Sequence, residues 1–241
     1  LDEDRQIAMM INEATGRGGL GVFEPAAVIL GRGFFSPRFV VSRIQLVAGH
    51  ALWGGTWRTR KIIAREYARI LIGTGLYYTA LSWYFLGGDK EGGIENDTRS
   101  SDFGKIRIGK TRLDPLAGIS QVVVFASRTA TGETKTIGGK IRPIRGDKLP
   151  YGGDKWSDVA ARFIRSKLHP IPATIVNLFD GTDLVGRETT VAGETAKLTT
   201  PMTYRDIYEA LKEQGLEDGT ALSLLAFLGE GLQTHKQGNN Q

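Results

Sequence analysis

Two groups of charged side chains in this sequence could do chemistry. The first is a basic run that could bind DNA phosphates or anionic lipid head groups, and it comprises Arg58, Arg60, Lys61, Arg65 and Arg69. The second is the carboxylate pair Glu95 and Asp97. Such a pair can hydrolyse a glycoside when burial raises the pKa of one carboxyl group. Because this pair lies in a glycine-rich polar stretch, we interpret it as part of a solvated loop.

Residue types that usually carry catalysis or bind metals are few and scattered. The chain has no cysteine, and its three histidines, His50, His169 and His235, are far apart in the sequence. It contains neither a phosphate-binding P-loop nor the nucleophile motif of the α/β-hydrolases. We therefore expect no metal, no cofactor, no catalytic residue and no enzymatic activity.

The basic run opens a segment that we expect to form one long helix, from about residue 56 to about residue 86. Thr56 can cap its start. From Ile70 to Gly88 there are nineteen residues without a charge, and apolar side chains surround the whole helix. At about 1.5 Å per residue this part is roughly 28 Å long, close to the roughly 30 Å of a bilayer core. It therefore needs a protein core or a membrane around it, and the sequence leaves open whether it ever spans a membrane.

Small and aromatic residues in the uncharged part are candidates for contact with a second helix or with lipid. Gly75 and Thr79 are spaced so that another helix could approach closely. Trp83 and Tyr84 belong to an aromatic group that could be buried in a core or lie at a membrane interface. The candidate membrane or helix-packing residues are Ile70, Leu71, Gly75, Thr79, Trp83 and Tyr84.

The charge distribution points to anionic partners. The 241-residue chain has a net charge of +5. Between Glu24 and Asp89 eight arginines or lysines stand against one acid, Glu66. A mean hydropathy of −0.18 excludes a protein with many membrane spans.

The remaining pattern predicts a mainly α fold with long glycine-rich loops. One small β-hairpin is expected at about residues 103–113, where Ile106 and Ile108 alternate with Lys105 and Arg107 before a Gly-Lys turn. The division we expect is an N-terminal helix with a flexible Gly-rich linker (1–33), a helical module (34–235) and a polar tail (236–241). Since the chain begins with leucine and lacks a signal-peptide pattern, we expect it to be a fragment of a longer polypeptide.

Five stretches together resemble the C-terminal region of giant tailed-phage proteins, namely large polyvalent proteins and internal virion (ejection) proteins. They are FFSPRFVVSRIQLVAGHALW, TRKIIAREYARILIGTG, SSDFGKIRIGKTRLDPLAGISQ, RSKLHPIPATIVNLFDGTDLVG and PMTYRDIYEALKEQG. The similarity covers about residues 30–235 and includes no active-site residues. It implies a protein that is packaged in the virion, in the capsid interior, and ejected with the DNA to meet the host envelope.

Three hypotheses about function follow. The first is a non-enzymatic structural module of an internal virion protein, forming a homo-oligomer or binding other ejection, core or portal proteins, with DNA and the host inner membrane as further partners. It could help to form a conduit across the host envelope, with the uncharged helix buried in protein before ejection and exposed to membrane afterwards. The second is a packaging or delivery domain of a giant effector or virion enzyme whose catalytic domains lie elsewhere. The third is a cell-wall or nucleic-acid enzyme, for which Glu95 and Asp97 are the candidate residues.

Overall fold

The structure is a computed structural model of the chain. It describes residues 3–87, 92–116, 118–136, 139–146, 155–183, 188–199, 202–228 and 230–234. Gly88, at the end of the predicted uncharged run, and the predicted tail at 236–241 lie outside the described residues.

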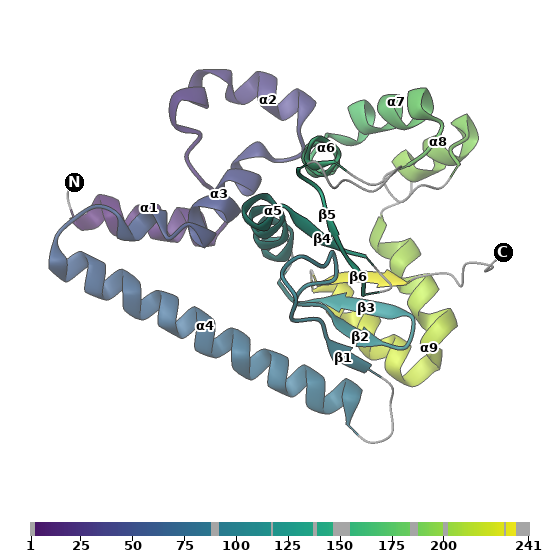
Figure 1. The fold of residues 1–241 in the computed structure, drawn as a ribbon. Helices are drawn as coiled ribbons and strands as arrows, with labels where there is room; N and C mark the ends of the chain where they lie inside the picture. Colours follow the sequence, from purple (N-terminus) through teal and green to yellow (C-terminus); the bar gives the residue numbers. More distant parts are fainter. Residues whose placement is uncertain are drawn as a thin grey trace. The chain divides into compact units, whose positions relative to one another are not determined.

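The fold is mainly helical with a small antiparallel sheet, as the sequence predicts (Figure 1). The helices are α1 (Glu3–Ala14), η1 (Gly21–Ala26), α2 (Ala27–Gly33), α3 (Pro37–Val47), η2 (His50–Leu52), α4 (Trp57–Leu86), α5 (Ile119–Thr131), α6 (Trp156–Arg165), α7 (Pro170–Asp180), α8 (Val191–Thr199) and α9 (Met202–Phe227). The strands are β1 (Gly92–Ile94), β2 (Ile106–Ile108), β3 (Thr111–Asp114), β4 (Glu133–Lys135), β5 (Ile141–Pro143) and β6 (Gly231–Thr234).

The chain forms two compact units. Unit 1 contains residues 1–74 and 154–194, and unit 2 contains residues 75–153 and 195–241. The continuous helix α4 contributes its first part to unit 1 and its second part to unit 2. Residues 1–33 belong to the same unit as α3.

The glycine-rich stretch 16–21, within the region where a flexible linker is expected, packs against α3. A side chain at Gly18 would have its Cβ 2.6 Å from the backbone nitrogen of Ser42, so this glycine allows the chain to lie directly against α3. Gln45 donates a 3.0 Å hydrogen bond to the Gly19 carbonyl, and Leu20 is buried. The glycines therefore provide close packing where the sequence suggested freedom.

Unit 1 also holds the start of α4. The Thr56 hydroxyl accepts a 3.2 Å hydrogen bond from the Thr59 amide, which confirms the predicted cap. Ile63 packs with Met10 and Ala51 in a small apolar cluster. Near its start, α4 therefore packs against α1 and η2 with the side that carries Ile63.

Unit 2 is built on a four-stranded antiparallel sheet in the order β1-β2-β3-β6. The predicted hairpin is confirmed as β2 and β3, with Arg107 opposite Arg112. α9 lies against the sheet, and Gln214 donates hydrogen bonds to the Ile108 carbonyl and the Thr111 hydroxyl, at 3.0 Å and 3.1 Å. Those two bonds join the helix to both strands of the hairpin beside its turn.

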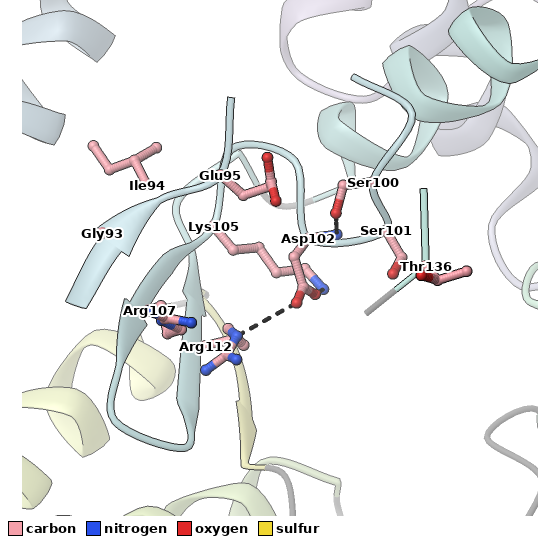
Figure 2. A pocket seen from close by; sticks show the side chains of 10 residues that line it. All are labelled: Gly93, Ile94, Glu95, Ser100, Ser101, Asp102, Lys105, Arg107, Arg112 and Thr136. Atoms are coloured by element: carbon pink, nitrogen blue, oxygen red, sulfur yellow. Dashed lines mark hydrogen bonds and ion pairs between the residues drawn. The ribbon is translucent and has the colours of Figure 1, made fainter. Parts of the chain in front are cut away.

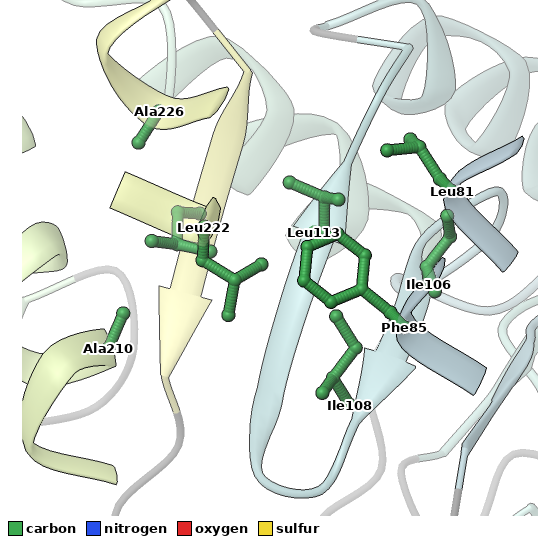
Figure 3. Packing of buried hydrophobic residues seen from close by; sticks show 9 residues of the cluster. Leu81, Phe85, Ile106, Ile108, Leu113, Ala210, Leu222 and Ala226 are labelled. Carbon is green, nitrogen blue, oxygen red and sulfur yellow. The ribbon is translucent and has the colours of Figure 1, made fainter. Parts of the chain in front are cut away.

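The core of unit 2 lies between the sheet, α9 and the end of α4 (Figure 3). Its buried members are Leu81, Phe85, Ile106, Ile108, Leu113, Ala210, Leu222, Ala226 and Leu232. The alternation that predicts the hairpin places both β2 isoleucines on this side, and it leaves Arg107 on the opposite face of the sheet.

Several segments expected to be loop are ordered elements. β4 and β5 form a second small sheet, and α8 follows α7, in parts of the chain where the sequence pattern predicts only long glycine-rich loops. β6 pairs with β3 across more than one hundred residues of sequence. After β3 ends at Asp114, α5 begins at Ile119.

Candidate functional site

Helix α4 is covered by protein on one side near each of its ends, and residues 68–73 between them are exposed around the whole helix. The buried side includes Thr59 and Ile63 in unit 1, and Leu81 and Phe85 in unit 2. These positions are separated by whole helical turns, so they form one line on the helix. The circumference is apolar as the sequence indicates, and the fully buried residues of the helix lie on this line.

The opposite side carries an exposed row that we call the α4 seam, which consists of Arg65, Arg69, Ile72, Leu76, Thr79 and Trp83. The steps between its members are four, three, four, three and four residues, which is the spacing of a coiled-coil contact line. Ile72, Leu76 and Trp83 are 63%, 67% and 80% exposed. Since all six residues lie on one continuous helix, the helix itself sets their alignment.

The predicted basic residues lie on the first part of α4 and do not converge on a common ligand position. Arg58, Lys61, Arg65 and Arg69 follow each other at three- or four-residue steps and share the exposed side, whereas Arg60 points elsewhere and donates to the Gly54 carbonyl at 3.1 Å.

The contacts of these cations are local. Arg58 is 3.9 Å from Glu3, Lys61 lies over the Trp57 ring, and Arg69 pairs with Glu66 one turn away. Arg65 has no ion pair among the residues that the structure describes. The run therefore forms an exposed basic face.

The predicted packing residues are also exposed. Ile70, Leu71 and Tyr84 are exposed on sides of the helix other than that of the seam. A side chain added at Gly75 would meet no atom within 4 Å, and the Thr79 hydroxyl donates to the Gly75 carbonyl at 2.9 Å within the helix. The two small residues thus leave the middle of the seam open to a close approach.

An open groove of about 510 Å³ lies beside the seam in unit 2. It is lined by Tyr78, Thr79, Ser82, Trp83, Leu86, Gly87 and Ile94. The Ser82 hydroxyl is buried and has no hydrogen-bond partner among the described residues. Ser82 and Ile94 are not among the residues predicted from the sequence. They line the groove only because β1 lies next to the end of α4.

Two tyrosines fix the covered side of α4 in unit 2. Tyr77 donates to Glu230 at 3.1 Å, and Tyr78 donates to the Gly104 carbonyl. Burial, together with the nearby Glu230 carboxylate, raises the pKa of Tyr77 to about 12. Burial likewise raises the pKa of Glu230. Both groups are therefore structural, and the aromatic residues of α4 divide between the core and the exposed side.

The candidate catalytic carboxylates are held in ion pairs. Both oxygens of Glu95 accept from Lys135, at 2.9 Å and 2.8 Å. Burial raises the pKa of Glu95, but the Lys135 hydrogen bond and the Asp97 amide outweigh it and lower the pKa overall. Hydrogen bonds from the Arg99 side chain and amide lower the pKa of Asp97 to about 2. A general acid for glycoside hydrolysis needs a raised pKa, so neither carboxyl group fits that role.

None of the described helices combines the length and apolarity needed to cross a membrane. Within the described ranges, no three His, Asp or Glu side chains gather as a metal site would require.

Comparisons of the chain with protein-family models, with characterised proteins and with solved structures found no match.

Proposed function

We propose that the chain is a non-enzymatic structural module of a phage internal virion (ejection) protein, and that two copies assemble through the α4 seam. The resemblance of five sequence stretches supports the virion role. The observation that carries the assembly role is a coiled-coil row of side chains left exposed on a 30-residue helix.

The seam is complementary to itself when two copies run antiparallel. In that arrangement Ile72 faces Leu76 of the second copy, Arg69 faces Thr79, and Arg65 faces Trp83. Every residue of the seam then has a partner, and the contact is the same on both chains, as in a twofold dimer. The apolar pair lies at the centre, and the small residue Gly75 allows the helices to approach there.

Charge favours this direction over the parallel one. Parallel helices would place Arg65 and Arg69 of one copy next to the same arginines of the other, which repel. Antiparallel helices place each Arg65 over an exposed Trp83 ring, a cation–π contact of about 0.5–1 kcal/mol at exposed sites. The groove beside Trp83 can take the apolar stem of an incoming arginine.

In the virion, this contact would order copies of the module within the capsid. The exposed basic residues outside the seam, Arg58 and Lys61, remain available to DNA or to other ejection, core or portal proteins. The proposed sequence is packaging in the capsid interior, ejection with the DNA, and contact with the host envelope.

The oligomeric state tests the assembly role. Light scattering on the purified chain should give the mass of a dimer, and Leu76→Glu should give a monomer with an unchanged circular dichroism spectrum. Leu71→Glu is the matched control, since Leu71 is 71% exposed on the same helix but outside the seam. A monomeric parent chain, or equal loss of the dimer in both variants, would reject the proposal.

The virion role has a separate test. Proteins of the encoding phage can be identified in purified particles before and after DNA ejection. The polypeptide that contains this chain should be present in full particles and depleted from emptied ones. Its absence from full particles would reject the virion role while leaving the dimer untouched.

A further inference from the structure

The face of the unit 2 sheet that points away from the core carries a row of polar side chains. The strand register places Gly93, Arg107, Arg112 and Gln233 side by side across the four strands. Arg107 and Arg112 are direct neighbours on β2 and β3, and Figure 2 shows both side chains on the same side of the hairpin.

Two like charges directly opposite each other on a sheet destabilise it. Arg112 is partly compensated, because its Nε lies 3.4 Å from the Asp102 carboxylate. That same carboxylate also accepts from Lys105 at 3.0 Å, so one negative charge serves two positive ones. Arg107 has no ion pair among the described residues. We call Asp102, Lys105, Arg107 and Arg112 the cationic cluster. It has three positive charges and one negative charge, so two positive charges in it are not balanced.

The cluster lines a cavity of about 260 Å³ (Figure 2). Its wall includes the hydroxyl groups of Ser100, Ser101 and Thr136. The Ser100 hydroxyl accepts a 3.2 Å hydrogen bond from the Asp102 amide, so its own hydrogen is free to be donated into the cavity. Arginine, lysine and hydroxyl donors around one space are the usual partners of phosphate oxygens.

Glu95 is the other carboxylate that lines the cavity, and it would repel a bound anion only weakly. Both of its oxygens are taken by Lys135, which adds a positive charge behind the wall. Arg99 pairs in turn with Asp97 at 3.0 Å and with Glu133 at 2.6 Å. The polar framework is thus fixed by its own ion pairs, and the unmet charge is concentrated at Arg107 and Arg112.

We propose that this cavity binds the phosphate group of a phosphomonoester. A phosphomonoester is a dianion near neutral pH and supplies the two missing charges, with Arg107 and Arg112 donating to its oxygens and the hydroxyl groups completing the shell. The cavity is larger than a phosphate group alone, so it also holds part of the esterified molecule. This inference is independent of the α4 seam and concerns a different face of unit 2.

Phosphate binding is tested by thermal unfolding and calorimetry on the whole chain, with inorganic phosphate and phenyl phosphate as probes. Both should raise the unfolding temperature above that in sodium chloride of equal ionic strength. Arg107→Gln should raise the Kd for phenyl phosphate by about tenfold, the usual result of losing a hydrogen bond to a charged group. Arg142→Gln is the matched control, because Arg142 is an exposed strand arginine of the same unit outside the cavity.

The same variant has a second readout that does not depend on the ligand. Removing one of two opposed arginines should leave the unliganded Arg107→Gln chain at least as stable as the parent, while weakening the stabilisation by phosphate as a tenfold higher Kd requires. Loss of stability without ligand would overturn the proposed charge conflict. Equal stabilisation by chloride would show an effect of ionic strength only. Equally tight binding of an oligonucleotide without terminal phosphates would overturn the assignment to a monoester.

Discussion

Truncating Phe85 to alanine should unfold unit 2 far more readily than truncating its neighbour Tyr84. Phe85 is 1% exposed and lies among the residues of β2, β3 and α9, whereas Tyr84 is 50% exposed on the same turn of α4. Replacing a buried core phenylalanine with alanine typically lowers the free energy of unfolding by about 3–5 kcal/mol. Truncating an exposed side chain lowers it by less than about 1 kcal/mol. A domain is typically stable by only about 5–15 kcal/mol, so Phe85→Ala removes a large fraction of the total.

The assay is chemical denaturation combined with amide hydrogen exchange. Because the chain has two units, the bulk signal need not report one transition, and exchange at the β2 and β3 amides isolates unit 2. Phe85→Ala should speed exchange there strongly, and Tyr84→Ala should leave it nearly unchanged. Similar effects of the two variants would refute the assignment of this part of α4 to the core of unit 2.

Two further predictions concern buried carboxyl groups. In unit 1 the Nδ1 of His50 lies 2.6 Å from Oε1 of buried Glu13, whose other oxygen has no partner among the described residues. His50→Ala removes this hydrogen-bond partner from a buried carboxyl group and should therefore lower the free energy of unfolding by about 1–3 kcal/mol, measured by denaturation, with Glu13→Gln in the same chain restoring part of it. In unit 2, burial raises the pKa of Glu230, so its contribution to stability is present below its ordinary pKa and is lost as the pH rises through the raised value. Glu230→Gln should accordingly be more favourable relative to the parent at pH 7 than at pH 4, and a difference that does not change with pH would contradict this.

The elements that depend on local sequence were predictable. The predicted long helix differs from α4 by one residue at its start, and the threonine cap is in place. The hairpin followed from strict alternation around a two-residue turn. In both cases neighbouring residues decide the structure, through helical periodicity or through the pleat of a strand.

The elements that depend on distant partners were not predictable. β6 is a short strand that forms only because β3 offers a free edge, and Thr111 pairs with Thr234 across the whole of α5 to α9. Gly18 looked like part of a flexible linker because its contact with Ser42 comes from α3, outside its own stretch. Pairings of this kind are decided by tertiary contacts, which local patterns do not contain.

The candidate sites also include features that local sequence predicts and features that only tertiary contacts decide. The basic run lies on one helix, as predicted, but its residue pattern does not indicate which side of that helix is covered by protein. The convergent cations are instead Lys105, Arg107 and Arg112, which appeared only as the polar positions of the hairpin. The signal was available, since the predicted turn already places Arg107 opposite Arg112.

The most direct test of the assembly role uses the absence of cysteine from the natural chain. Chains carrying Ile72→Cys and chains carrying Leu76→Cys, distinguished by a small tag, can be mixed and oxidised. Antiparallel pairing through the α4 seam predicts that the mixed disulfide, between position 72 of one copy and position 76 of the other, forms faster than either symmetric one. Preferential formation of the symmetric disulfides, or no cross-linking at concentrations where the chain is a dimer, would contradict the account.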